Sequence, residues 1–457
     1  MKHRNLEIER LRAVAVIMTT VAHGMFVWAL PTFMGFSFTG VDLFFVISGF
    51  VVTLSILRLL PKFSPKETFS QKLKKGSTAL ETFYLKRAFR IVPLAVTWLV
   101  IYFSLAVIFK KIGGGGNFAE PRTIAVEILG IMSGFYNFLT SYGMSGNLSH
   151  YWSLAVEEQF YLVVPVLLVF FVTKKNRILL ALSSIVLLMI GTRIISALMG
   201  GNKVLDLVYA YRYFSLFFGV IIALIYNGKK PKTASQDNEN FFITHFDYHL
   251  RKYFSCPFLS SWFSADTQRK LAEWCFAPLL LVFSFGVKSF KFFLGLGCIM
   301  VIWSINGIAD PPVRYGFSYV IVAIFAGVLV YLASLETGWI LDVPILRNIL
   351  EYIGSRSYGI YLGHFAFIRL KPTLLKLYDA NLPSWVKISH RGLFLQDTLV
   401  WIGLLIICEM LFWLIEQPFI NMGKAFIKSR IVPDKFSTAR AKLVQTLSQN
   451  LVVEINN

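Results

Sequence analysis

Charged residues are scarce in this sequence of 457 residues. They make up 15% of the chain, whereas hydrophobic residues make up 56% and the mean hydropathy is +0.62. Soluble domains devote about a quarter of their residues to charge. The composition therefore excludes an ordinary soluble domain and predicts an integral membrane protein.

Cysteine is also sparse, with only four residues in the chain. None stands in a C-x-x-C pair, which excludes the usual zinc-binding and disulfide frameworks. The loop at 110–149 contains a glycine run at 113–116, which lacks the Gly-Lys-Ser/Thr that completes a phosphate-binding loop, and we expect this loop to be a flexible external linker. The sequence predicts neither a bound metal nor a permanently bound cofactor.

Acidic residues are outnumbered by basic ones, 25 to 45, which gives a net charge of +20. Such an excess is typical of nucleic-acid-binding proteins, but here it lies in segments that flank apolar runs, and no nucleic-acid motif accompanies it. Cytoplasmic loops of membrane proteins carry this excess, and anionic lipid headgroups attract it. We therefore expect membrane lipids as partners and no nucleic acid.

Apolar runs close to the ~20 residues of a spanning helix recur along the whole chain. They lie at about 11–30, 41–60, 91–109, 151–173, 178–198, 213–227, 291–308, 316–334, 352–370 and 397–420. The expected fold is an all-α, polytopic transmembrane helix bundle of about ten spans. The short apolar piece at 275–287 predicts a re-entrant segment, with an eleventh span as the alternative.

The basic clusters orient these spans, because they precede the first run and follow the second, fourth and sixth. With ten spans, both the N- and the C-terminus are cytoplasmic. We expect one membrane domain at 1–420, with a polar cytoplasmic insertion at about 228–272, and a basic cytoplasmic tail at 421–457. The first span reads as a retained anchor because no cleavage site follows it.

Two ionisable residues, Arg12 and His23, lie within the first apolar run. Eleven positions correspond to about three helical turns, which places them on nearly the same face roughly 16 Å apart. An ionisable residue inside a span indicates a functional site. Asp42 opens the second run at the predicted depth of His23, where contact would fix the imidazole tautomer. The alternative is that Asp42 caps its helix in external water.

A basic cluster, Lys86, Arg87 and Arg90, precedes the third run at its predicted cytoplasmic start. Arg87 and Arg90 are three positions apart and share a helix face. Two guanidinium groups on one face suit a polyanion, because each binds phosphate oxygens in a bidentate fashion. Anchoring of the membrane topology is the alternative explanation.

Adjacent glutamates, Glu157 and Glu158, stand near the start of the fourth run. They point about 100° apart on a helix, so at most one faces squarely into the bundle. A buried carboxylate there would pair with an arginine or orient a substrate hydroxyl. The alternative is an acidic pair in the aromatic belt at the membrane interface.

The last two runs carry further polar residues. Ser357, Tyr361 and His364 follow the spacing i, i+4, i+7 and form a polar stripe, with a packed, hydrogen-bonded histidine as the alternative for His364. Glu409 and Glu416 are predicted to share a face, with Pro418 ending or kinking the helix. Arg193 and Arg212 flank the predicted external loop between the fifth and sixth runs and are candidate counter-ions.

These motifs occur in a fixed order along most of the chain. They are Arg12-x10-His23, GVDLFFVISGF at 40–50, Lys-Arg-x-x-Arg at 86–90 followed by Ile91 and Pro93, WSLAVEEQFY at 152–161, SYGIYLGH at 357–364 and Glu-x-Pro at 416–418. Any one alone is weak, but the ordered set is specific. The sequence resembles the acyltransferase 3 family of bacterial membrane proteins, which O-acylate extracytoplasmic sugars and other small acceptors.

The resemblance implies transfer of an acyl group, commonly acetyl, across the bacterial cytoplasmic (inner) membrane. The donor would be cytoplasmic acyl-CoA, and the acceptor a carbohydrate or lipid-linked glycan, such as O-antigen or exopolysaccharide. Some family members append an SGNH esterase-like domain, and the short tail after 420 leads us to expect a stand-alone form. A transporter or flippase for a lipid-linked sugar, or a non-catalytic scaffold, would also carry many spans. The oligomeric state stays open.

Roles for the singled-out residues follow from the same resemblance. His23 would act as general base or as a transient acyl acceptor, and Arg12 would hold the donor or developing negative charge. Arg87 and Arg90, with Lys86 beside them, would receive the CoA phosphates. Asp42 and one of Glu157 or Glu158 would shape the outer site.

Overall fold

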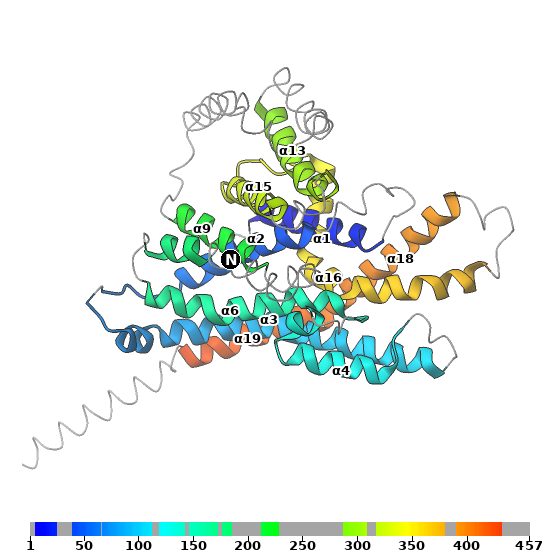
Figure 1. Cartoon of the computed structure of the whole chain (residues 1–457), viewed down its shortest axis with the longest axis horizontal. Coiled ribbons are helices and arrows are strands. Elements are labelled where there is room, and N and C mark those ends of the chain that lie inside the picture. Colours follow the sequence, from blue (N-terminus) through cyan, green and yellow to red (C-terminus); the bar gives the residue numbers. More distant parts are fainter. Residues whose placement is uncertain are drawn as a thin grey trace, which may run out of the picture.

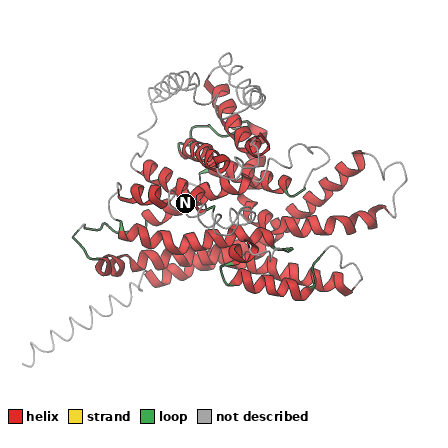
Figure 2. Ribbon diagram, in the orientation of Figure 1, coloured by secondary structure: helices red, strands yellow, loops and turns green. Residues whose placement is uncertain are grey.

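The computed structural model describes residues 5–24, 39–64, 66–111, 118–141, 146–171, 176–184, 212–227, 287–308, 317–379 and 390–431. Within these ranges every regular element is a helix, as Figure 2 shows, and the prediction of an all-helical architecture is confirmed for them. The glycine run, the insertion at 228–272 and the piece at 275–286 lie outside the described residues. So do most of the fifth predicted span and the tail beyond 431.

The helices differ widely in length. Their bounds are α1 Leu6–Ala22, α2 Gly40–Leu57, α3 Phe69–Lys111, α4 Pro121–Met132, α5 Tyr136–Ser141, η3 Ser149–Tyr151, α6 Trp152–Phe170, α9 Tyr213–Asn227, α13 Val287–Ile308, α15 Phe317–Ser334, α16 Pro344–Asp379, α18 His390–Leu411, the π-helical turn η5 Phe412–Glu416, and α19 Gln417–Ile431. In Figure 1, α3, α6 and α19 lie lengthwise in the lower half of the view, with α1 and α2 above them and α13 and α15 at the top.

Several helical segments are long and apolar enough to cross a membrane. By length and composition these are Gly40–Leu57, Phe69–Lys111, Ser149–Phe170 and Asp397–Arg430, and shorter apolar helices occupy Tyr213–Tyr226, Lys291–Ile302 and Val320–Ser334. Large apolar side chains such as Val100, Leu162 and Met410 are more than half exposed. Apolar residues on the outside as well as in the core are what a bundle surrounded by lipid requires.

Three predicted boundaries are wrong. The first helix ends at Ala22 instead of continuing to 30, and His23 is its C-cap residue. The third helix begins at Phe69, so the basic cluster lies well inside a helix of 43 residues, about 64 Å long at 1.5 Å per residue. The expected external linker contains α4 and α5; Pro121, which occupies the first turn of α4, suits a helix start because its missing N–H is not needed there.

Pro418 does not end its helix, because the chain continues through α19 to Ile431. A proline ring meets the carbonyl of the residue four positions earlier, here Leu414. That residue lies in the π-helical turn η5, whose wider hydrogen-bond pattern accommodates the proline. The extra residue of a π-turn also shifts the helical register, and the predicted co-facial pair is split. Glu409 accepts hydrogen bonds from Arg356 at 2.8 and 2.9 Å, whereas Glu416 is buried.

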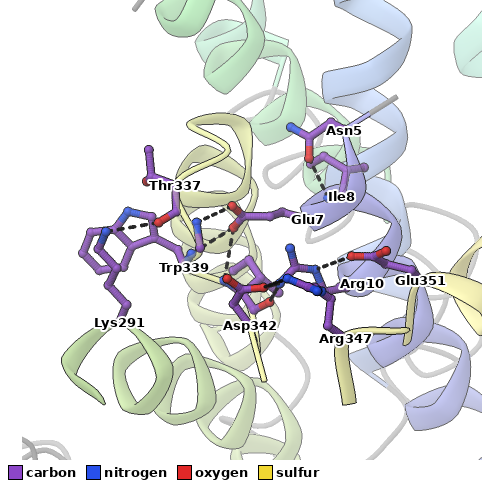
Figure 3. Close-up of polar contacts among 12 residues, drawn as sticks. Asn5, Glu7, Ile8, Arg10, Lys291, Thr337, Trp339, Asp342, Arg347 and Glu351 are labelled. Atoms are coloured by element: carbon purple, nitrogen blue, oxygen red, sulfur yellow. Dashed lines mark hydrogen bonds and ion pairs between the residues drawn. The ribbon is translucent and has the colours of Figure 1, made fainter. Parts of the chain in front are cut away.

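A polar anchor fixes the start of α1 against the loop that joins α15 to α16 (Figure 3). The Glu7 carboxylate accepts hydrogen bonds from the backbone N–H groups of residues 338–340, at 2.7 to 3.1 Å. Arg10 forms ion pairs with Asp342 at 3.1 Å and with Glu351 at 3.4 Å. Because Glu351 belongs to α16, these contacts hold α1 at a set position along α16.

Helices α2 and α9 cross with their backbones in close approach. A Cβ atom added at Gly49 would lie 2.0 Å from the backbone oxygen of Leu216, and one at Gly219 would lie 2.2 Å from that of Val46. Backbone atoms cannot retreat as side-chain ends can, so only glycine permits this approach.

We predict that Gly49→Ala lowers the melting temperature of the detergent-purified protein, because the new methyl group forces α2 away from α9, at a cost of about 1–3 kcal/mol. Gly327→Ala is the matched control, since its Cβ would meet Ile222 at an ordinary 3.6 Å. Equal melting temperatures for the two variants would contradict the close crossing.

Candidate active site

Helices α1 and α16 run side by side in the same direction. Their contacts begin at the ion pair between Arg10 and Glu351 and end where the imidazoles of His23 and His364 meet. Arg12 lies between these points and donates a hydrogen bond to Glu9 at 3.1 Å. The side chains of Arg12 and His23 therefore both lie near α16.

The hydrogen bonds of the two imidazoles define their tautomers. His364 Nδ1 lies 2.6 Å from the backbone oxygen of Tyr361, so Nδ1 carries the proton and Nε2 is the acceptor. His23 Nδ1 lies 2.8 Å from the oxygen of Thr19 and 3.2 Å from His364 Nε2, so it donates to both. This assignment leaves the lone pair of His23 on Nε2.

A third histidine, His150, completes the cluster, and the sequence interpretation did not assign it to the site. Its ring stacks on Phe365 at 4.6 Å and lies 5.2 Å from the ring of His364. Its Nε2 donates to the oxygen of Leu362 at 3.0 Å, while its buried Nδ1 has no hydrogen-bond partner. The available signal was its place two residues before Trp152, where the WSLAVEEQFY block begins, at the external end of the fourth predicted span. Within the described ranges, no group of three or more His, Cys, Asp or Glu residues is arranged to hold a metal ion.

Asp42 does not contact His23, and that prediction is wrong. Its carboxylate is fully buried and accepts hydrogen bonds from Arg212 and Ser215, each at 3.0 Å. The alternative of a cap exposed to water is also wrong. The physical reason is that α2 packs on α9, and a buried carboxylate is stable only beside an opposite charge, which Arg212 supplies. The suggestion that Arg212 is a counter-ion is confirmed.

A small cavity of about 100 Å³ lies beside α16, next to the histidine cluster. Its polar lining comes from α1, α2, α3, α6 and α16, and comprises Arg12, Ser48, Arg87, Arg90, Ser153, Glu157, Tyr161, Ser357, Tyr358 and Tyr361. Glu157 is the glutamate that faces inward, and it accepts hydrogen bonds from Ser48 at 2.9 Å and Tyr161 at 2.6 Å. Glu158 is not part of this lining.

Tyr361 separates the cavity from the histidines. Its hydroxyl shares a hydrogen bond of 2.5 Å with Ser153 and donates to the oxygen of His150 at 3.0 Å. Its ring centroid lies 5.6 Å from that of His364. The predicted polar stripe therefore exists, with Ser357 and Tyr361 at the cavity and His364 beyond it.

Two cationic groups, Arg87 and Arg90, face the cavity, and neither forms an ion pair with a carboxylate of the described residues. Arg87 lies over the rings of Phe83 and Tyr161, at 5.6 and 5.4 Å. Within the part of the chain that the structure describes, neither Arg87 nor Arg90 donates a hydrogen bond or forms an ion pair. Lys86 is exposed and lies outside the lining. A cavity wall with two such guanidinium groups is suited to an anionic ligand.

A second, larger cavity of about 390 Å³ adjoins the first. The two share Arg12, Val51 and Arg90, and the larger one also contains Arg58 and Glu416. Ligand pockets have volumes of ~300–1,000 Å³, so the second cavity is large enough for part of a ligand and the first only for a narrow end.

These features define a polytopic membrane protein with a polar site inside its helix bundle. The family model described as an acyltransferase domain, that of the acyltransferase 3 family, matches residues 5–415, and the chain belongs to this family.

Curated relatives match along nearly the whole chain. The peptidoglycan O-acetyltransferase OatA of Listeria monocytogenes is 26% identical over 442 residues, which cover 92% of this chain and 57% of the relative. The putative peptidoglycan O-acetyltransferase YrhL of Bacillus subtilis is 24% identical, with 93% and 56% covered. A putative O-acetyltransferase of Staphylococcus aureus is 23% identical, with 91% and 57% covered. The chain thus spans somewhat more than half the length of these relatives. No solved structure matches it.

We predict that Asp42→Asn destabilises the protein by about 3–5 kcal/mol, because it removes the buried negative charge that faces the guanidinium group of Arg212. The melting temperature should fall, and the double variant Asp42→Asn with Arg212→Gln should recover part of it. Loss of activity at an unchanged melting temperature would instead indicate a direct role of Asp42 in the chemistry.

Proposed function

We propose that this protein is a membrane O-acyltransferase that moves an acetyl group from cytoplasmic acetyl-CoA to a hydroxyl of an extracytoplasmic glycan. The observation that carries the proposal is the cavity with unpaired Arg87 and Arg90, whose far end at Tyr361 adjoins the His23–His364 pair. Family membership and the names of the relatives support the same reaction.

The proposed topology has ten spans in the bacterial cytoplasmic membrane, with both termini in the cytoplasm. The parallel course of α1 and α16 supports it, because the predicted first and ninth spans both run outward. It places Arg12, Arg87 and Arg90 toward the cytoplasm and the histidine cluster toward the outside.

The donor would occupy both cavities. The larger one would take the nucleotide end of CoA, and the narrow one the pantetheine arm with its thioester. Arg87 and Arg90 would bind phosphate oxygens, since neither is held in an ion pair by the residues that the structure describes. Arg12, which lines both cavities, would lie beside the bound donor.

His23 would act as the general base. Its Nε2 would remove the proton of the acceptor hydroxyl while the hydroxyl oxygen attacks the thioester carbonyl carbon. The carbon–sulfur bond then breaks, the acetyl ester forms on the glycan, and the CoA thiolate takes up a proton to leave as thiol. Thr19 supports this role, because its carbonyl holds the other nitrogen of His23 in the protonated form.

The acceptor would be a glycan outside the membrane. The names of two relatives point to peptidoglycan, and exopolysaccharide or O-antigen would present the same sugar hydroxyls. The proposed acceptor is therefore defined by its chemistry, as a primary or secondary hydroxyl of a sugar.

We predict that His23→Ala removes glycan O-acetylation, since loss of a general base costs ~10²–10⁴-fold in rate. The measurement is mass spectrometry of cell-surface glycans from cells that carry the wild type, the variant or neither. Protein level, membrane insertion and acetyl-CoA affinity should stay unchanged. Normal O-acetylation in the variant would contradict the base assignment, and unchanged glycans in cells lacking the protein would contradict the proposed function.

We predict that Arg87→Gln and Arg90→Gln each weaken acetyl-CoA binding about 10- to 100-fold, because a charge-assisted hydrogen bond contributes about 1.5–3 kcal/mol. Isothermal titration of the detergent-purified protein measures the dissociation constant. Lys86→Gln is the matched control: it removes the same charge one position away but from an exposed side chain, and it should bind normally. If all three variants bind like the wild type, the cluster serves only membrane topology.

A further inference from the structure

His364 is a second imidazole hydrogen-bonded to His23, and the proposed reaction gives it no role. It is fully buried, and its Nε2 lies 3.2 Å from His23 Nδ1. The unprotonated Nε2 of His364 accepts the N–H of the residue that would act as base.

The surroundings of the pair make a full charge on one ring costly. The ring of Phe365 lies 4.7 Å from that of His23 and 4.8 Å from that of His364. Carrying an isolated cation into such apolar surroundings is expensive. A second imidazole beside the base lowers this cost, because it allows the positive charge to be shared between two rings instead of one.

The bonds at the two ends of the pair are compatible with such a transfer. His364 Nδ1–H donates to the oxygen of Tyr361 at 2.6 Å and stabilises a positive charge on that ring. The oxygen of Thr19 accepts from His23 Nδ1–H, but it also accepts the backbone N–H of His23 at 3.3 Å. That carbonyl therefore keeps a donor when the Nδ1 proton moves.

We infer that His23 and His364 share one proton during turnover, with His364 as a relay residue that acts through His23. When His23 Nε2 receives the proton of the acceptor hydroxyl, the proton on His23 Nδ1 passes to His364 Nε2. His23 is then neutral with its proton on Nε2, and His364 carries the positive charge. This inference rests on the proposed function.

The return step restores both rings. His23 gives its Nε2 proton to the CoA thiolate, and the extra proton on His364 Nε2 returns to His23 Nδ1. The sum over both steps is one proton moved from hydroxyl oxygen to sulfur, with no oxidant, reductant or further reactant. A backbone carbonyl or an amide side chain can accept the hydrogen bond but cannot take the proton.

Two substitutions separate this role from simpler ones. In His364→Gln the side-chain oxygen can replace Nε2 as acceptor toward His23, whereas in His364→Asn the amide can replace Nδ1 as donor toward Tyr361. If His364 is only a structural residue, the Asn variant should work normally. If it only holds the orientation of His23, the Gln variant should.

Proton sharing predicts that both variants lose activity. The assay is release of CoA thiol from acetyl-CoA by membrane vesicles of producing cells, which contain the natural acceptor. We expect the maximal rate to fall by on the order of 10- to 100-fold in each variant. Loss of the general base itself costs ~10²–10⁴-fold in rate. The KM for acetyl-CoA should stay unchanged. In mixtures of H2O and D2O, a plot of the wild-type rate against the fraction of deuterium should be curved, because more than one proton moves. The same plot for the Gln variant should be linear. Near-normal rates in either variant, or an unchanged curve in the Gln variant, would overturn the inference.

A second measurement does not depend on activity. Solid-state NMR of 15N-histidine-labelled protein, which has seven histidines, should detect coupling between His23 Nδ1 and His364 Nε2 through their hydrogen bond. His364→Gln should abolish that signal at an unchanged melting temperature. Absence of the coupling in the wild type overturns the inference. If vesicles with wild-type protein release no more thiol than those with His23→Ala, the proposed function fails instead.

Discussion

Burial of ionisable groups in an apolar helix bundle is the constraint on which this structure depends. Each such group must find a partner inside the bundle, because water is not available to solvate it. Asp42 has Arg212, Glu157 has two hydroxyl donors, and His23 has His364. Arg87 and Arg90 differ from these groups, because among the described residues neither forms an ion pair or donates a hydrogen bond. Paired groups hold the helices together, whereas these two guanidinium groups are placed to bind a ligand.

Features confined to one helix were predictable from the sequence. Ser357, Tyr361 and His364 share a face because helical geometry fixes that spacing, and only one of Glu157 and Glu158 faces the cavity for the same reason. The pairing of Arg87 with Arg90 follows equally from their spacing. Within a helix, the spacing of residues is enough to place side chains relative to one another.

Contacts between helices were not predictable in this way. Asp42 and His23 were placed at one depth in the membrane, but depth defines only a layer, and several ionisable residues share it. Which of them meet depends on helix rotation and on close crossings such as that at Gly49 and Gly219, which bring α9 and its flanking Arg212 to Asp42. The ends of helices were not predictable for a related reason. Hydropathy identifies only the apolar part of a helix, whereas α3 already begins at Phe69 and includes the basic segment before its apolar part.

In the proposed reaction, the distance between the cavity that would hold the donor and the imidazole of His23 determines how far the acyl group must move. The cavity ends at Tyr361, and His364 follows three residues later on the same helix, a rise of about 4.5 Å. The reacting carbonyl would therefore pass one aromatic ring, whose hydroxyl is held by Ser153, and not the full thickness of the membrane. Most of the crossing would be accomplished by the donor, which reaches inward along the arginine-lined cavities, and by the acceptor, which approaches from the other side. In this proposal Tyr361 separates the donor from the histidines, and the bonds of its hydroxyl to Ser153 and to the oxygen of His150 hold it in that position.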